Sequence, residues 1–273
     1  MISLASLQRI DPAQSWLLPL RALLQSLGQV QGVADEVDLL PQLNRMVQGL
    51  RNAAGLPLSF VPQSCLPDGC AYESFIFAQG QVPSRDNLHD LLNALIWLRF
   101  PQIKRQLNAL QAACIEEAGV GQVRGKVRDA LTLFDENAAI VAVRADARGQ
   151  ALAAALRGHA WQELLVQQRA AFGQDIAVFL FGHALLEKLC TPYKAITAHV
   201  WLLPLEDAFF SAALAQQCAM IDEAVAQQLA GNRLTHTRCF TPLPVLGVPG
   251  WWPQQDAAFY ADTAVFRPRR NKT

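Results

Sequence analysis

The sequence predicts an α+β fold, in which a predominantly helical single domain packs around a small β-sheet and ends in an irregular Pro/Trp-rich C-terminal wrap. Long stretches of the chain have apolar residues at helical spacing. Three short runs, 139–143, 176–181 and 196–203, are instead rich in β-branched or aromatic residues, as strands are. No internal repeat or long linker divides residues 1–273, so we expect one domain with a small sheet covered by many helices.

The composition is that of a folded protein. Hydrophobic residues make up 52% of the sequence and charged residues 17%, against a usual charged share of about 25%. This composition, without low-complexity segments, argues against disorder. Lys and Arg together number 23, as do Asp and Glu, so no overall field directs the protein to nucleic acid or to an acidic partner. A local basic patch is compatible with this balance, and nucleic acid therefore stays open as a ligand.

The sequence predicts no membrane span. Its longest apolar stretch, 176–181, is far shorter than the ~20 residues that cross a bilayer. The N-terminal segment 1–15 has neither a basic region nor a continuous apolar core. We therefore expect no signal peptide, no membrane partner and a cytoplasmic location.

The six cysteines are scattered along the chain, mostly in apolar or helical context. We expect them to be reduced, buried thiols of a cytoplasmic protein. Cys65 and Cys70 flank a Pro-Asp-Gly turn and could meet there. Their spacing is not CxxC and no second pair follows, so the pattern does not favour a zinc site.

The N-terminal part, residues 1–54, is predicted to be helical. Apolar residues recur at helical spacing over 13–27 and again over 34–51. Prolines between positions 57 and 67 then enforce an extended, irregular connection. The short aromatic segment 72–78 that follows fits either a strand or a helix.

Two consecutive helices are predicted in the middle of the chain. Either Asp86 or Asn87 can cap the first, which runs to Phe100. Pro101 fits the first turn of the second helix, which glycines end after residue 118. A helix or turn over 127–134 then leads to Asp135-Glu136-Asn137, a turn signal before the first strand.

The C-terminal half continues the alternation. Helices are predicted over 150–156 and 160–172, a short helix over 182–189 follows the second strand, and a long helix spans 205–229. The Pro-rich segment after it is predicted to be an ordered wrap, because its large aromatic side chains need burial. Only the basic end, 267–273, is predicted to be a loose tail.

The first candidate site element is a polar stripe on the helix that begins near Asn87. Asn87, Asp90 and Asn93 are spaced three apart and share a face, and His89 lies one turn before Asn93. Asn is a poor helix former that a plain surface would rarely select twice, which favours a functional role. A capped helix with a solvated face is the alternative.

The second candidate element is the acidic pair Asp135 and Glu136, preceded by Arg124 and Arg128. Carboxylates on a short loop are the ligands that a hard divalent cation prefers. Acidic side chains in turns also commonly accept backbone N–H bonds, and this structural alternative stays open. Arg124 lies in a glycine-rich stretch that can either bind an anion or serve as a flexible connection.

The third candidate element is the pair His183 and Glu187, one helical turn apart and directly after an apolar strand. A His and a carboxylate at this spacing can share a metal or orient each other. The alternative is a core His that is hydrogen-bonded to its own Glu. His199, in the next predicted strand, is expected to face the same region. No GxGxxG, GxxxxGK[ST] or GxSxG motif is present, which disfavours Rossmann, P-loop and α/β-hydrolase folds.

Four strings of the sequence, in order, resemble the bacterial family catalogued as domain of unknown function 3025. They are PSRDNLHDLLNALIWLRFPQIKRQLNALQ (83–111), RGKVRDALTLFDENAAIV (124–141), FGHALLEKL (181–189) and the tail PLPVLGVPGWWP…FYADTAVFRPRR. The resemblance implies a family core over 72–266, a mostly proteobacterial origin and no established activity. It also implies that the polar residues within these strings are family features. Ala138 departs from the glycine that we would expect there, which leaves the geometry of the preceding turn open.

Two hypotheses of function follow from these elements. The first is a metal-assisted hydrolase of a phosphate ester or nucleic acid, with a divalent metal as cofactor. The second is a non-catalytic ligand-binding or assembly protein whose polar stripes form a buried hydrogen-bond network. In the first hypothesis the candidate catalytic residues are His89, Asn93 and Asp90, with His89 as general base or ligand; the substrate-binding residues are Arg85, Arg128, Lys104 and Lys188; and the metal ligands are Asp135, Glu136, His183 and Glu187.

Overall fold

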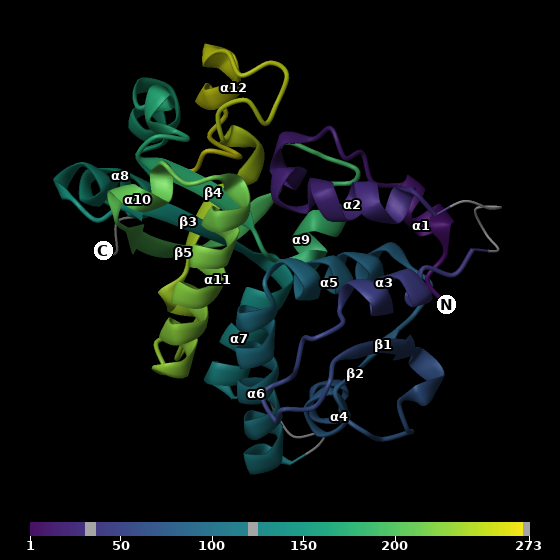
Figure 1. The fold of residues 1–273 in the computed structure, drawn as a ribbon. Coiled ribbons are helices and arrows are strands. Elements are labelled where there is room, and N and C mark those ends of the chain that lie inside the picture. Colours follow the sequence, from purple (N-terminus) through teal and green to yellow (C-terminus); the bar gives the residue numbers. More distant parts are fainter. Residues whose placement is uncertain (31–36, 120–124, 270–273) are drawn as a thin grey trace.

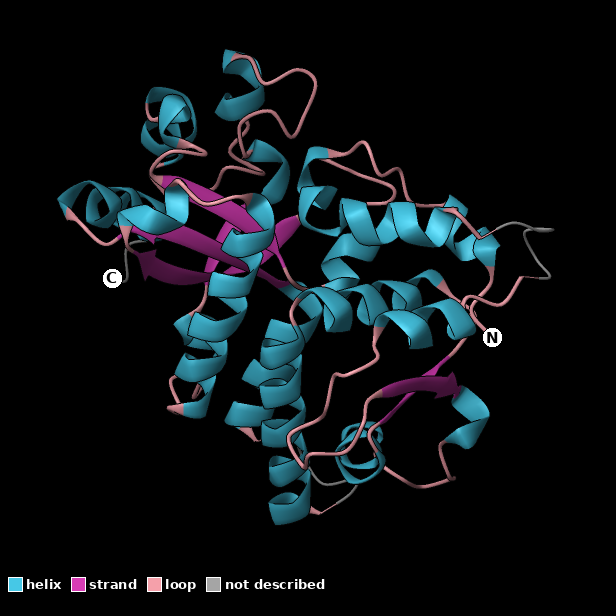
Figure 2. Cartoon of the chain, in the orientation of Figure 1, coloured by secondary structure: helices cyan, strands magenta, loops and turns pink. Residues whose placement is uncertain are grey.

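The computed structural model of the chain describes residues 1–30, 37–119 and 125–269. It confirms the predicted α+β class, because helices dominate and the strands form small sheets (Figure 2). Figure 1 shows the larger sheet at one end of the molecule and the small sheet with α4 (Tyr72–Gln79) at another, with α5 (Leu88–Arg99) and α9 (His183–Lys188) between them. Segment 72–78, which fitted either a strand or a helix in the sequence, is therefore helical.

The larger sheet has the strand order β4-β3-β5-β6 among the described residues. The central strand β3 (Ala138–Arg144) pairs antiparallel with β4 (Ile176–Leu180) and parallel with β5 (Thr197–Leu205). All three strands were predicted from their β-branched and aromatic runs, and they are confirmed. Every residue of β3 before Arg144 is buried, as expected for a strand covered on both faces.

The fourth strand, β6 (Thr241–Pro244), lies inside the segment that was predicted to be irregular. It pairs antiparallel with the start of β5. Its two prolines, Pro242 and Pro244, conceal it in the sequence because proline cannot donate to the ladder. An edge strand tolerates proline, and β6 is at the sheet edge. The small sheet, β1 (Ser59–Pro62) parallel to β2 (Gln81–Ser84), was not predicted, since each strand is short and contains a proline.

The N-terminal helices are shorter than predicted. The apolar run over 13–27 folds as a 3-10 turn (Ser15–Leu20) followed by α2 (Arg21–Gly28), because Pro19 cannot continue an α-helical hydrogen-bond ladder. Of the run over 34–51, α3 (Leu40–Met46) is helical, and residues 34–36 lie outside the described residues. A further short helix, α1 (Leu4–Gln8), precedes both.

The two middle helices form as predicted, with α6 at Pro101–Ala118 directly after α5. Asn87 caps α5 by accepting the Asp90 N–H at 2.7 Å, whereas the Asp86 carboxylate accepts the N–H of Ser3. The prediction of a turn at 135–137 is wrong. These residues form the last turn of α7 (Lys126–Asn137), and the chain enters β3 without a loop.

Because no turn precedes β3, alanine is compatible with position 138, where a glycine was expected. This residue has an extended backbone conformation, with φ −78° and ψ 145°, which any residue adopts. A glycine is therefore not required there. Glycine is required instead at Gly182, where a Cβ atom would lie 2.5 Å from the carbonyl oxygen of Glu136.

The C-terminal half differs from the prediction mainly around residue 205. The predicted long helix over 205–229 is two helices, because β5 continues through Leu205 and residues 211–213 separate a short first helix from a long second one. The predicted helix 160–172 is a π-helical turn (Gln162–Gln167) followed by a 3-10 turn (Arg169–Ala171). The remaining helices are α8 (Ala147–Gly158), α9 (His183–Lys188), α10 (Asp207–Phe210), α11 (Leu214–Ala230) and α12 (Ala257–Ala261).

The C-terminal wrap is ordered by its aromatic residues. Phe259, Tyr260 and Phe266 are buried, and their rings pack on one another. Arg267 starts the predicted loose tail, yet its carbonyl oxygen accepts the indole N–H of Trp161 at 2.7 Å. Any loose tail therefore begins after Arg267, and residues 270–273 lie outside the described part.

The cysteines are free thiols, as predicted, but most are not buried. Cys65 and Cys70 are exposed, and Cys218 is the buried one. The exposed pair lies in the Pro-rich connection, where the chain runs over the surface. Among the described helices, none combines the length and apolar character that crossing a bilayer would demand.

Candidate functional site

Three helices bring the candidate residues together: α5, α7 and α9 (Figure 1). Helix α9 begins where β4 ends, and α7 ends where β3 begins, so pairing of the two strands brings these helix ends together. The N–H groups of Phe181 and Gly182 both donate to the Ala138 carbonyl oxygen, at 3.0 and 2.9 Å. The first turn of α9 is thereby fixed against the last turn of α7.

His89, Glu136 and His183 converge at this junction. Each offers one ligand atom, and the three atoms lie within 4.8 Å of one another. The Nε2 atoms of the two histidines are 3.1 Å apart, and Nε2 of His183 is 3.6 Å from a carboxylate oxygen of Glu136. Tetrahedral ligands with bonds of about 2.0–2.1 Å are separated by about 3.3 Å, so these distances fit one small metal ion.

Glu187 contacts the His89 ring nitrogen that does not face His183, and so orients the ring. Its carboxylate lies 2.9 Å from Nδ1 of His89, on the ring side away from His183. A carboxylate accepts, so Nδ1 carries the proton and the Nε2 lone pair of His89 is free to bind a metal. A carboxylate behind a ligating histidine is a common arrangement around metals in proteins.

The neutral His183 ring has two tautomers, and with the proton on Nε2 it donates to Nε2 of His89 at 3.1 Å. Nδ1 of His183 is buried without a hydrogen-bond partner and is 4.0 Å from a carboxylate oxygen of Asp135. If this nitrogen carries the proton, its N–H is directed towards a negative charge, and Nε2 also presents a lone pair. Both Nε2 lone pairs then converge, and two lone pairs 3.1 Å apart repel unless a cation lies between them.

A series of hydrogen-bonded side chains extends from Asp135 into the interior. Nζ of Lys104 lies 2.6 Å from the Asp135 carboxylate and 2.9 Å from the Asn93 side-chain oxygen. The Asn93 amide then donates to the hydroxyl of Tyr72 at 3.2 Å. Lys104 is 4% exposed and the ammonium is compensated by the Asp135 charge, as a buried charge must be. The predicted stripe on α5 therefore faces the interior rather than solvent.

Asp90 and Arg85 form a separate pair at the mouth. Two guanidinium nitrogens of Arg85 lie 3.0 and 3.1 Å from the two carboxylate oxygens of Asp90, and the Arg85 backbone N–H donates to the same carboxylate. The Asp90 side chain is nearly buried, whereas that of Arg85 is 60% exposed. This two-point contact fixes the turn between β2 and α5.

These residues surround one cavity of about 320 Å³. Glu73, on α4, lines it and accepts the Asn108 amide at 2.7 Å. A carboxylate in the aromatic segment YESFIF was the sequence signal for Glu73, but sequence reasoning assigned it no role. The lining side chains are Gln63, Leu66, Tyr72, Glu73, Arg85, His89, Asp90, Asn93, Asp135, Glu136 and His183.

The surroundings shift several pKa values. Burial lowers the pKa of His183 to about 4, so the ring is neutral near pH 7, as a metal ligand must be. Burial, and then the charge of Asp135, raise the pKa of Glu73 to about 7. The same two causes raise the pKa of Glu136. Burial acts to raise the pKa of Asp135 too, but the Lys104 charge and hydrogen bond, with His183, bring it below its usual value.

Other predicted site residues lie outside this cavity. Arg128 is half-buried on α7, and Lys188 is exposed and donates to the Asn137 side chain at 3.2 Å. Neither lines the cavity. His199 was expected to face the same region, but its ring packs edge-on against Phe240. Arg124 lies outside the described residues.

Comparison with known proteins gives a family but no activity. Residues 58–270 match the family described as "Protein of unknown function (DUF3025)". The match begins before Tyr72, the start expected from the resemblance of the four strings, and it includes every residue of the cavity. No curated protein and no solved structure matches the chain.

Proposed function

The chain belongs to the DUF3025 protein family, whose description assigns no activity, and we propose that it is a metal-dependent hydrolase centred on His89, Glu136 and His183. The observation that supports the proposal is the convergence of three ligand atoms within 4.8 Å at the wall of a cavity. Two imidazoles and one carboxylate are a ligand set of catalytic zinc sites, in which a fourth position is left for water or substrate.

The ligand types favour zinc or a similar transition metal over a hard cation. Imidazole nitrogens suit zinc, iron and nickel, whereas magnesium and calcium prefer oxygen ligands. This revises the hypothesis of a hard cation held by Asp135 and Glu136. Asp135 is paired with Lys104, and Glu187 is paired with His89, so both are proposed to support the ligands instead of binding the metal.

His89, Glu136 and His183 would hold the metal, which would supply activation of a water molecule for attack near neutral pH. Glu73 lines the same cavity and has a pKa of about 7, which suits a group that accepts and returns a proton during hydrolysis. We assign proton transfer to Glu73 rather than to Asn93 or Asp90, whose polar atoms are held by Lys104 and Arg85.

The proposed substrate is a phosphate ester. The cavity is rich in carboxylates, and within the described part of the chain Arg85 is the one Lys or Arg side chain that lines it. A phosphate therefore needs the metal charge as well as Arg85 in order to bind there. Arg128, Lys104 and Lys188 are withdrawn from the proposed substrate contacts, because Lys104 is buried in its ion pair and the other two lie outside the cavity.

Metal content tests the centre directly. The purified chain, stripped with chelator and reloaded with zinc, should retain about one equivalent of zinc. His89→Ala and His183→Ala should each lose stoichiometric zinc while keeping the wild-type circular dichroism spectrum. Glu187→Gln should keep the fold and weaken zinc binding by about 10- to 100-fold, because it removes the charge that orients His89. His236→Ala is the matched control, since His236 is exposed and outside the cavity.

Turnover tests the reaction. The zinc-loaded protein should hydrolyse p-nitrophenyl phosphate or bis(p-nitrophenyl) phosphate, and both His183→Ala and Glu73→Gln should lower kcat by at least about 100-fold. Hydrolysis of p-nitrophenyl acetate alone would contradict a phosphate ester as substrate. A folded wild type that binds no zinc, iron, nickel or manganese would overturn the metal centre. The buried chain from Tyr72 to Asp135 would then support the second hypothesis, that of a structural network.

A further inference from the structure

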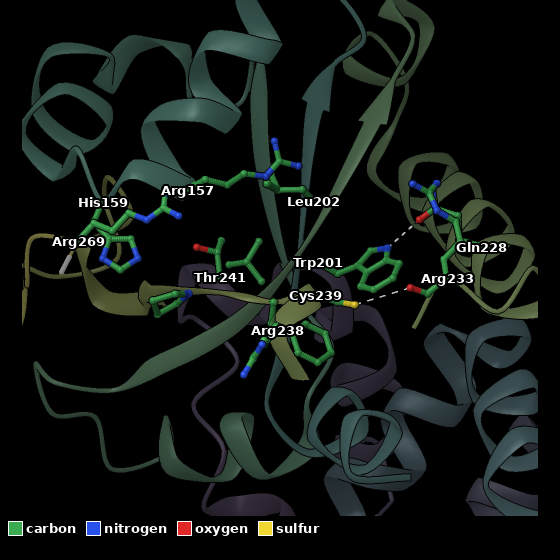
Figure 3. A pocket seen from close by; sticks show the side chains of 13 residues that line it. Arg157, His159, Trp201, Leu202, Gln228, Arg233, Arg238, Cys239, Thr241 and Arg269 are labelled. Carbon is green, nitrogen blue, oxygen red and sulfur yellow. Dashed lines mark hydrogen bonds between the residues drawn. The ribbon is translucent and has the colours of Figure 1, made fainter. Parts of the chain in front are cut away.

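A second cavity, of about 580 Å³, lies between α8, β5, α11 and the segment before β6. It shares no lining residue with the histidine cavity. Among the residues that the structure describes, four arginines and no Asp or Glu line it: Arg157, Arg233, Arg238 and Arg269. In Figure 3, Arg157 and Arg269 lie beside His159 on one side of the cavity, and Arg233 lies near Gln228 on the other, with Trp201 between them.

The arginines of this cavity lack acidic partners. None of the four forms an ion pair with a carboxylate of the described residues. By contrast, Arg85, Arg144 and Arg148 each contact an aspartate. The chain as a whole has a net charge of zero, so this cavity is a local concentration of positive charge. Such a concentration attracts an anion.

Two aromatic side chains, Trp201 and Phe240, are among the lining residues of the cavity. Trp201 is 6% exposed, and its indole N–H donates to the Gln228 side chain at 2.8 Å, which fixes the ring. The ring of Phe240 lies 6.1 Å from that of Trp201, and both pack on Phe134 beneath. A rigid aromatic surface surrounded by arginines suits a ligand that has a planar apolar part as well as its charge.

A neighbouring cavity extends this charged surface. It has a volume of about 600 Å³, shares His159 and Pro242 with the first, and adds Arg267. His159 has φ 56°, in the left-handed region that non-glycine residues rarely occupy, and its ring stacks on Trp161 at 5.1 Å. The backbone thus fixes an imidazole at the boundary between the two cavities.

We propose that this cavity binds a nucleoside phosphate, with the phosphates on the arginines and the base against Trp201 and Phe240. Arginine presents planar, paired N–H donors that match phosphate oxygens. The volume falls within the range of about 300–1,000 Å³ that is typical of small-molecule sites. The site uses none of the residues of the proposed hydrolase centre and stands independently of that proposal.

Titration calorimetry on the full chain with ADP tests the site. ADP should bind, and the double variant Arg157→Ala/Arg238→Ala should weaken its affinity at least tenfold, since it removes two phosphate contacts. Both residues are exposed, so the fold should be unaffected. Arg45→Ala, an exposed arginine on α3, is the matched control and should bind as the wild type does. Undetectable ADP binding by the wild type, or equal affinity in the double variant, would overturn the proposal.

Two partial ligands separate the contributions. Pyrophosphate and adenosine should each bind more weakly than ADP; pyrophosphate binding as tightly as ADP would refute a role for the base. His183→Ala should bind ADP with wild-type affinity, because His183 belongs to the other cavity. Loss of ADP binding in that variant would place the nucleotide at the histidine centre and contradict this assignment.

Discussion

Lys104 compensates the negative charge that is buried beneath the candidate site. It brings a positive charge into a region where Asp135 and Asn93 are buried, and where Asn93 also contacts the half-buried Tyr72. Desolvation of two charges is costly, and their attraction offsets this cost only while both are present. The sequence showed Lys104 as a basic residue on a helix, which more often indicates a solvated face or a substrate contact.

Removing the lysine should therefore be costly. Lys104→Met leaves the Asp135 carboxylate buried without its partner, and we expect a loss of about 3–5 kcal/mol of unfolding free energy. Urea unfolding followed by circular dichroism measures it. The double variant Lys104→Met/Asp135→Leu, which removes both charges, should recover most of the loss. A cost below about 1 kcal/mol for the single change would show that the pair does not support the fold.

At the scale of elements, the junction of α7 and α9 determines whether the candidate ligands meet. The two helix ends touch at Gly182, where an added Cβ would lie 2.5 Å from both the Glu136 carbonyl oxygen and the Asn137 nitrogen. These are backbone atoms, which cannot move aside as a flexible side chain can. Close packing of the two helix ends thus requires a glycine at position 182.

We expect Gly182→Ala to displace α9 from α7. The unfolding free energy should fall by about 1–3 kcal/mol, as for other overpacked sites. Zinc affinity should fall at least tenfold, because His183 moves relative to Glu136. Gly28→Ala is the matched control, since a Cβ there meets nothing within 4 Å. Wild-type zinc affinity in Gly182→Ala would contradict the proposed role of this junction.

The start of α6 depends on a carboxylate from another helix. Asp222, on α11, accepts the backbone N–H groups of Gln102 and Ile103 at 3.0 and 2.9 Å. These are free donors of the first helical turn, which the helix itself cannot satisfy. Asp222 is 3% exposed, and burial, although opposed by these two hydrogen bonds, raises its pKa from 3.8 to about 6.

This shift predicts a pH dependence. With a raised pKa, folded Asp222 binds a proton more tightly than unfolded Asp222 does, so its contribution to stability is greatest below pH 4 and falls as pH rises to about 6. A shift of about two units corresponds to about 3 kcal/mol. Urea unfolding between pH 4 and 7 should show the difference between wild type and Asp222→Asn declining by up to that amount. A difference that grows with pH would show that the hydrogen bonds from the backbone N–H groups affect the pKa of Asp222 more than burial does.

At the scale of the whole molecule, the even charge balance conceals two cavities of opposite character. Counting the described residues, one is rich in carboxylates and has two histidines, and the other has four arginines and no acid. Phe134 separates them: its ring packs on Trp201 and Phe240, and the next residue in α7 is Asp135. Total charge counts both cavities together, so it could not reveal either of them.

Local patterns in the sequence determined much of this protein. Helical spacing and capping predicted α5 and α6, and β-branched runs predicted β3, β4 and β5. The same patterns brought His89, Asn93, Glu136 and His183 forward as candidates. These properties follow from neighbours within about one turn or one strand, whose geometry the backbone fixes.

Only the tertiary structure decided which candidates meet. His89 and His183 are far apart in sequence, and their 3.1 Å contact depends on how α5 packs against α9 and on the pairing of β3 with β4. Residues 135–137, predicted to form a turn, continue α7 instead, and Lys104 from α6 compensates the charge of the buried Asp135. The arginine cavity arises in the same way, from residues that no local spacing relates. Contacts between distant segments follow from the filling of a shared core, and a periodicity along the chain does not contain that information.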